Sequence, residues 1–126
     1  MVKLTYCIRR RADMTWDEFS AYWRDVHAPL IAKHAEALGI RRYVQVRTAP
    51  APGLHAALQG RNGGSPEPFD GVAELWFDSL DAFTGPASPE AKLASKEVFE
   101  DQRMFIDLAA SPQWLGEEAV IIDGPS

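Results

Sequence analysis

The chain has 126 residues, enough for a single domain (1–126) with a hydrophobic core and too few for two ordinary domains. Its hydrophobic content of 46% and charged content of 25% are typical of globular proteins. The net charge of −5 argues against a nucleic-acid-binding surface, and no apolar run approaches the length of a membrane span. No signal peptide opens the chain and Cys7 is its single cysteine, which excludes an internal disulfide. We therefore expect a cytoplasmic protein with neither nucleic acid nor membrane as a partner.

The first third of the chain predicts a strand, a long helix and a second strand. Apolar and polar residues alternate over residues 2–9, as they do in a strand. Thr15 and Glu18 have the spacing of a capping box, and apolar residues follow at helical spacing, so we expect a helix from about 16 to 38. Alternation returns at 43–48, YVQVRT, which predicts the second strand.

The middle of the chain is rich in proline and glycine. Residues 49–68 hold four prolines and four glycines, which predicts a long loop. Such loops in compact domains are either functional covers or disordered segments. GVAELWF, 71–77, predicts a third strand, and a short helical turn is expected at 79–83.

The last third predicts one more helix and one more strand. Ser88 is a suitable N-cap and Pro89 suits the first helical position, so a helix is expected to run from there to about Leu108. Pro112 interrupts the chain, and EAVIID, 118–123, is expected to form the last strand.

The predicted order is β-α-β-β-α-β, which is the ferredoxin-like arrangement of an α+β protein. Right-handed connections would give one antiparallel sheet with both helices on one face. Both faces of this sheet are expected to be apolar, and the open face is expected to pack against a second copy in a homodimer. The apolar positions behind this expectation are Cys7, Val44, Val46, Ala73, Leu75, Phe77 and Ile121 or Ile122.

Two polar residues occupy positions where a helix should be apolar. Asp101 falls in the middle of the apolar stripe of the second helix, and a buried carboxylate is costly unless it is paired, hydrogen-bonded or protonated. His27 shares a helix face with Trp23 and Ile31. Pro29 lacks an N–H group, so the helix should kink or loosen there and leave room beside His27. A shared His27–Asp101 pocket is the resulting hypothesis.

Ordinary structural roles compete with this hypothesis. A lone histidine beside an apolar stripe is more often a satisfied core residue than a catalyst. The alternative for Asp101 is a simple ion pair with an arginine such as Arg9, Arg47 or Arg103. Tyr6, Tyr43, Glu74 and Trp76 alternate along strands, and one set of them would line a helix-facing pocket, but ordinary cross-strand packing explains them as well. His27 and His34 are about 10 Å apart along a helix, too far for one metal ion, and no zinc-site spacing occurs.

Several motifs together give the chain a clear resemblance to a known family. With the basic end of the first strand, the sequence closely resembles the EthD-type family of the dimeric α+β barrel superfamily over about residues 3–122. The motifs are MTWDEFSAYWRDVHAPLI, RRYVQV, FDGVAELWFDSLDAF and FEDQRMFID. The resemblance implies a dimer and a hydrophobic pocket between helices and sheet, often without a bound cofactor. The family's histidine maps onto His27 and its helix-two aspartate onto Asp101.

The expected function is a cofactor-independent lyase, cyclase or isomerase acting on a small aromatic or polyketide-like compound. His27 would be the base, Asp101 would orient it or act as a second acid, and Tyr43 or Tyr6 would polarise a carbonyl. The aromatic side chains of Trp23, Trp76 and Phe105 would hold the substrate, and no cofactor or metal is expected. An oxidoreductase or oxygenase accessory protein, and a non-catalytic hydrophobic-ligand-binding module, remain the alternatives.

Overall fold

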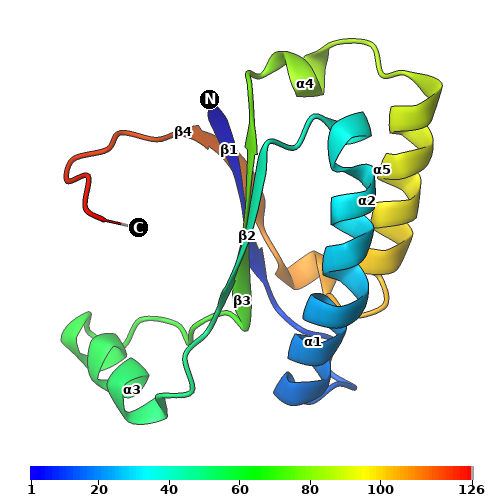
Figure 1. The fold of residues 1–126 in the computed structure, drawn as a ribbon. Coiled ribbons are helices and arrows are strands. Elements are labelled where there is room, and N and C mark those ends of the chain that lie inside the picture. Colours follow the sequence, from blue (N-terminus) through cyan, green and yellow to red (C-terminus); the bar gives the residue numbers. More distant parts are fainter. Residues whose placement is uncertain (126) are drawn as a thin grey trace.

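A four-stranded antiparallel sheet lies at the centre of the computed structural model, which describes residues 1–125 (Figure 1). The sheet has the strand order β2-β3-β1-β4, and each neighbouring pair is antiparallel. The bounds are β1 (Val2–Ile8), β2 (Arg42–Arg47), β3 (Gly71–Phe77) and β4 (Gln113–Glu117). This arrangement confirms the predicted ferredoxin-like α+β fold.

The long first helix consists of three consecutive segments. They are α1 (Trp16–Tyr22), the π-helical turn η1 (Trp23–His27) and α2 (Ala28–Leu38). The capping box is present at the start, and Gly39 ends α2 in the left-handed conformation with φ of 73°. In η1 the Ala28 N–H bonds back to the Trp23 carbonyl, five residues earlier. The predicted loosening before Pro29 is therefore confirmed, and it takes the form of a wider turn.

The second long helix, α5 (Pro89–Gln102), ends earlier than the sequence predicts. Its start is confirmed, since the Ser88 side chain accepts a hydrogen bond from the Ala91 N–H. The predicted end at Leu108 is wrong because the chain turns after Gln102 to bury Phe105 and Ile106 in the core. Two short helices, α4 (Asp81–Thr84) and the 3-10 turn η2 (Leu108–Ala110), flank α5 along the chain.

The segment 49–68 is not the structureless loop that was predicted, because it contains the helix α3 (Pro52–Arg61). Pro52 stands at the start of this helix, where its missing N–H costs nothing, and good helix formers such as Ala56, Ala57 and Leu58 follow. The prolines and glycines of this segment therefore mark the ends of a helix as well as turns.

The predicted strand at 118–123 is also wrong, since the last strand is β4 at Gln113–Glu117. The reason lies in the length of β1. Glu117 pairs with Val2, the first residue of β1, so the chain beyond Glu117 has passed the end of its partner strand. Ile121 and Ile122 lie outside the sheet and are each 88% exposed.

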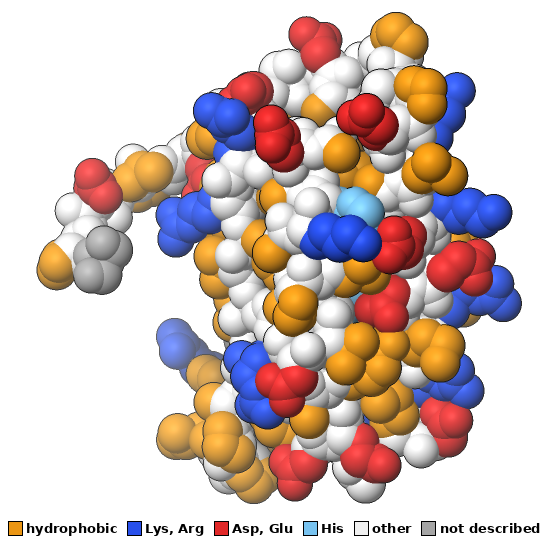
Figure 2. Space-filling model, turned by 45° about the vertical axis from the view of Figure 1, so that its right-hand side comes forward, with side chains coloured by type: hydrophobic (Ala, Val, Ile, Leu, Met, Phe, Trp, Pro, Cys, Tyr) orange, Lys and Arg blue, Asp and Glu red, His pale blue; other side chains and the backbone are white. Residues whose placement is uncertain are grey.

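The helices α1, α2 and α5 lie together on one face of the sheet, while α3 and the C-terminal segment project on the other side (Figure 1). The helix-facing side holds the core, to which Ala73, Leu75 and Phe77 contribute. Strand register places Val46, Val72 and Cys7 in one row on the other face. The C-terminal segment stands away from the body of the molecule and carries apolar side chains (Figure 2). Among the described residues no helix is long and apolar enough to cross a membrane.

Candidate functional site

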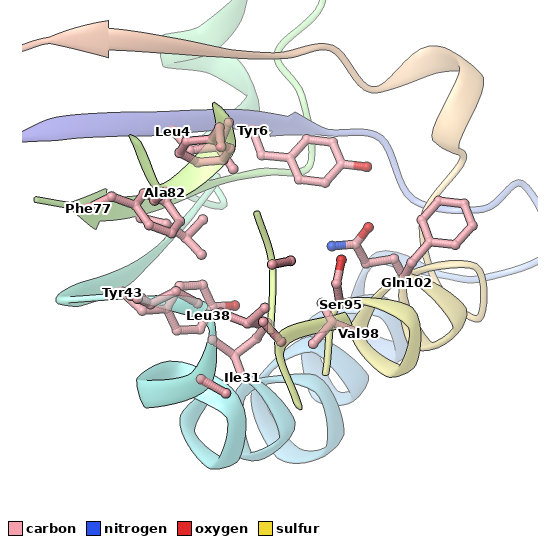
Figure 3. A pocket seen from close by; sticks show the side chains of 18 of the residues that line it. Leu4, Tyr6, Ile31, Leu38, Tyr43, Phe77, Ala82, Ser95, Val98 and Gln102 are labelled. Atoms are coloured by element: carbon pink, nitrogen blue, oxygen red, sulfur yellow. The ribbon is translucent and has the colours of Figure 1, made fainter. Parts of the chain in front are cut away.

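A cavity of about 890 Å³ lies between the helix-facing side of the sheet and the helices α2 and α5 (Figure 3). Its walls are mostly apolar. The apolar wall residues include Leu4, Leu75 and Phe77 from the sheet, Ile31 from α2, and Val98 from α5. A smaller set of polar and aromatic groups also lines it, and this set includes four residues singled out by the sequence: Tyr6, Trp23, His27 and Tyr43. A largely apolar cavity with a few polar groups is the usual form of a small-molecule site.

His27 reaches this cavity from the π-helical turn η1. Only 4% of the residue is exposed, and its ring packs against Phe105 with 4.8 Å between centroids. Its Nδ1 atom lies 2.7 Å from Oδ2 of Asp101 on α5. The structure thus brings together the two polar residues that the helical stripes single out.

Asp101 has a second partner that the sequence did not single out. The Tyr22 hydroxyl donates a hydrogen bond of 2.6 Å to the other carboxylate oxygen of Asp101. Tyr22, Asp101 and His27 therefore form a continuous hydrogen-bonded chain. The signal for Tyr22 was present in the motif around AYWRDVHAPL, where a tyrosine stands five residues before the histidine. None of the three candidate arginines binds Asp101. Arg9 donates to the Pro68 carbonyl, Arg47 donates to Ser20 and Gln45, and Arg103 pairs with Glu100.

The electrostatics of this chain favour a neutral imidazole. Burial lowers the pKa of His27 below its ordinary value, while the hydrogen bond and charge of Asp101 partly oppose that change. Burial and the adjacent Asp101 raise the pKa of Tyr22 to about 12, so its hydroxyl stays a donor. Because Asp101 accepts, the proton of the neutral His27 ring belongs on Nδ1. Nε2 then carries the free lone pair, and none of the described residues forms a hydrogen bond with it.

The two tyrosines of the cavity differ in their partners. The Tyr43 hydroxyl accepts a hydrogen bond of 2.9 Å from the side-chain amide of Gln45, whereas no described residue is hydrogen-bonded to the Tyr6 hydroxyl. Burial raises the pKa of both phenols, so both are protonated in the neutral range.

Two predicted substrate-binding residues lie elsewhere. Trp76 and Glu74 point to the opposite face of the sheet from Leu75, and Trp76 is covered there by Lys3 and Arg42. The expectation that Trp76 lines the same pocket is wrong, because strand alternation puts it on the other face. Phe105 is fully buried and packs behind His27 instead of lining the cavity.

Metal-binding groups do not gather among residues 1–125. No three His, Cys, Asp or Glu side chains in that range lie together where they could hold a metal ion. Of the hydrogen-bonded chain described above, His27 is the member that lines the cavity.

Solved structures of bacterial proteins share this fold. An ethyl tert-butyl ether D (EthD) family protein from Bacillus halodurans C-125 is 22% identical, with a TM-score of 0.60 over 94% of this chain and 99% of that one. An EthD-like protein from Ralstonia eutropha JMP134 is 17% identical, with a TM-score of 0.59 over 96% and 94%. A dimeric protein of unknown function with a ferredoxin-like fold from Bacteroides fragilis is also 17% identical, with a TM-score of 0.54 over 93% and 95%.

The family is shown by a match over most of the sequence. Comparison with curated protein sequences gives no match. The family model of the EthD domain, however, matches residues 11–109, which include the long helix, His27 and Asp101. The chain therefore belongs to the EthD domain family.

Proposed function

We propose that this protein is a cofactor-independent enzyme that moves protons on a small aromatic or polyketide-like compound, as a lyase, cyclase or isomerase does. His27 is its general base, and Asp101 and Tyr22 are positioning residues that act through His27. The observation that carries the proposal is the free Nε2 of a buried, neutral His27 that lines a mostly apolar cavity.

The proposed step needs no redox partner. Nε2 of His27 takes a proton from a carbon next to a substrate carbonyl. The electron pair of that C–H bond becomes the C=C bond of an enolate, and the carbonyl π pair moves to oxygen. The imidazolium that forms is stabilised by the Asp101 carboxylate at 2.7 Å and returns its proton to the same or another carbon.

The cavity supports a flat, apolar substrate. Trp23 and Tyr43 present aromatic surface to it, and its other walls are mainly aliphatic. His27 itself is buried, and charge interactions are stronger at a buried group than in water.

The test is hydrogen–deuterium exchange at carbon, measured by NMR on 2-tetralone in D₂O. This ketone is apolar and bicyclic, and its α C–H groups are acidic. The wild-type protein should accelerate exchange above the buffer rate, and His27→Ala should remove at least about 10²-fold of that acceleration while the fold persists. Full activity in His27→Ala would show that His27 is not the general base.

Two further readouts separate the alternatives. Oxygen consumption with a phenolic substrate would favour an oxidative role. Binding that survives loss of both His27 and Asp101, with no turnover of any tested compound, would favour a non-catalytic binding module.

The open face of the sheet supports a second proposal, a homodimer packed sheet to sheet. Val46 is 46% exposed there, in a row with Val72 and Cys7. Exposed apolar groups on a sheet face are stabilised by a second layer. The dimeric state of the Bacteroides fragilis protein supports this assembly by likeness of fold.

A further inference from the structure

Two polar groups that line the cavity, one from the sheet and one from α5, have no hydrogen-bond partner among residues 1–125. The first is the hydroxyl of Tyr6. The residue is only 5% exposed, yet no described residue is hydrogen-bonded to this hydroxyl. The second is the side-chain amide of Gln102, which is half-buried at the end of α5 and likewise has no hydrogen-bond partner among residues 1–125.

Tyr6 and Gln102 approach the cavity from opposite sides. In Figure 3 the Tyr6 side chain extends from β1 and the Gln102 amide extends from α5 into the same space. Gln102 directly follows Asp101, so its Cα lies about 3.8 Å from that of the residue that holds His27. Both side chains line the same cavity as the proposed base, His27.

From this arrangement we infer that Tyr6 and Gln102 are a donor pair that binds a carbonyl or hydroxyl oxygen of the substrate beside His27. The inference rests on the proposed function and deepens it, because it names the substrate class. That class is an otherwise apolar molecule whose ring or chain bears an oxygen able to become an enolate or phenolate.

The chemistry of the two side chains selects this class. The Tyr6 hydroxyl donates, and the Gln102 amide both donates and accepts. A neutral phenol or enol satisfies both groups, and after proton loss both N–H and O–H donate to the resulting oxyanion. A hydrocarbon ligand would instead leave two buried polar groups unpaired, which is unfavourable. Other cavity-lining polar groups are less suited, since the Tyr43 hydroxyl already has Gln45 as partner and Ser95 is exposed.

The proposal is tested by binding two probes of similar shape, 2-naphthol and 2-methylnaphthalene, measured by isothermal titration calorimetry. The quantity of interest is the ratio of their two dissociation constants, because it cancels the shared apolar contact. Tyr6→Phe and Gln102→Leu each remove the polar group and keep the volume. Each should reduce the preference for 2-naphthol by about two- to tenfold.

A matched control is Gln59→Leu on α3. The Gln59 amide donates to the Ser65 carbonyl six residues later, and Gln59 does not line this cavity. It should leave the ratio unchanged. Circular dichroism and thermal unfolding check that each variant is folded, and Gln102→Glu, which keeps size but loses the N–H donors, gives a second route should Gln102→Leu fail to fold.

The outcomes separate this inference from the proposed function. An unchanged ratio in both variants, or no preference for 2-naphthol in the wild type, would overturn the donor pair even if exchange at carbon depends on His27. A ratio that falls in both variants supports the pair, even in a protein that shows no exchange activity.

Discussion

The Nδ1 atom of His27 lies 2.7 Å from Oδ2 of Asp101, although the two residues are 74 positions apart in the chain. The contact joins the π-helical turn η1 to the last turn of α5, and it fixes which nitrogen of the ring faces the cavity. Its consequences can be tested one residue at a time.

Asp101→Asn keeps the size of the side chain and removes its charge. Because Asp101 raises the pKa of His27 against the larger effect of burial, the variant should show a lower pKa for His27 than the wild type. Its amide N–H also favours the wrong tautomer, so exchange activity should fall by about 10² or more. NMR titration of the ring and the exchange rate measure the two effects, and an unchanged pKa would mean that Asp101 does not act on His27.

Tyr22→Phe removes one hydroxyl and leaves the ring that packs on Phe105 with centroids 5.1 Å apart. The variant loses the hydrogen bond that the hydroxyl donates to the Asp101 carboxylate, so the free energy of unfolding should drop by about 1.5 kcal/mol. Urea unfolding measures the change. Tyr43→Phe is the comparison, because the Tyr43 hydroxyl is hydrogen-bonded to a neutral amide. Its loss should lower the free energy of unfolding by less, about 1 kcal/mol. Equal stability of wild type and Tyr22→Phe would contradict the proposed chain.

The stability of the protein should depend on pH through His27. Its pKa in the folded state lies below the ordinary 6.5, so the unfolded state binds the extra proton first. The stability that a neutral His27 contributes is fully present above about pH 6.5, the ordinary pKa of the unfolded state. It is lost as the pH falls through the lower pKa of the folded state. His27→Gln should therefore lose less stability than the wild type between neutral and mildly acidic pH, and parallel stability curves for the two proteins would show that His27 does not titrate in this way.

Gly71 is a test of how tightly the site is packed. A Cβ at this position would lie 2.5 Å from Cζ3 of Trp23, an indole that lines the cavity. Gly71→Ala should displace the ring, lower stability by about 1–3 kcal/mol and weaken ligand binding. Gly53→Ala on α3, where the added Cβ meets nothing within 4 Å, is the matched control and should be neutral or slightly stabilising. Similar results from the two variants would mean that Trp23 is free to move.

The proposed dimer is tested by a charge on the open sheet face. Val46→Lys should dissociate the dimer, because a lysine would be buried without a partner between two sheets. Val26→Lys is a close control. Val26 is 47% exposed, almost the same as Val46 at 46%, but it lies on η1 and not on the sheet. Native mass spectrometry gives the mass of each assembly. A Val46→Lys protein that remains dimeric would place the interface elsewhere.

Much of the fold could be predicted from local patterns. The capping box at Thr15, the Ser88 cap and the alternation in 71–77 are short-range signals, and each marks the element that the structure has. The errors occur where distant pairing decides. The strand at 118–123 has suitable residues, but Glu117 already pairs with Val2, the first residue of β1, so no part of β1 is left to pair with them. The helix end at Gln102 likewise depends on the burial of Phe105, which only the packed core determines.

The same division holds for the candidate site. His27 and Asp101 were predicted because each breaks an apolar stripe on its own helix. Trp76 was misplaced because alternation assigns residues to two faces without saying which face the helices cover. Tyr22 and Gln102 break no pattern, since polar residues at the margin of a helix stripe are common. Their significance depends on the three-dimensional contacts.

The most direct test of the central claim is ¹⁵N NMR of the His27 ring at neutral pH. A neutral ring with its proton on Nδ1 and a free Nε2 that shifts when 2-naphthol is added is the expected result. A ring protonated on Nε2, or an imidazolium at neutral pH, would contradict the role of His27 as a base.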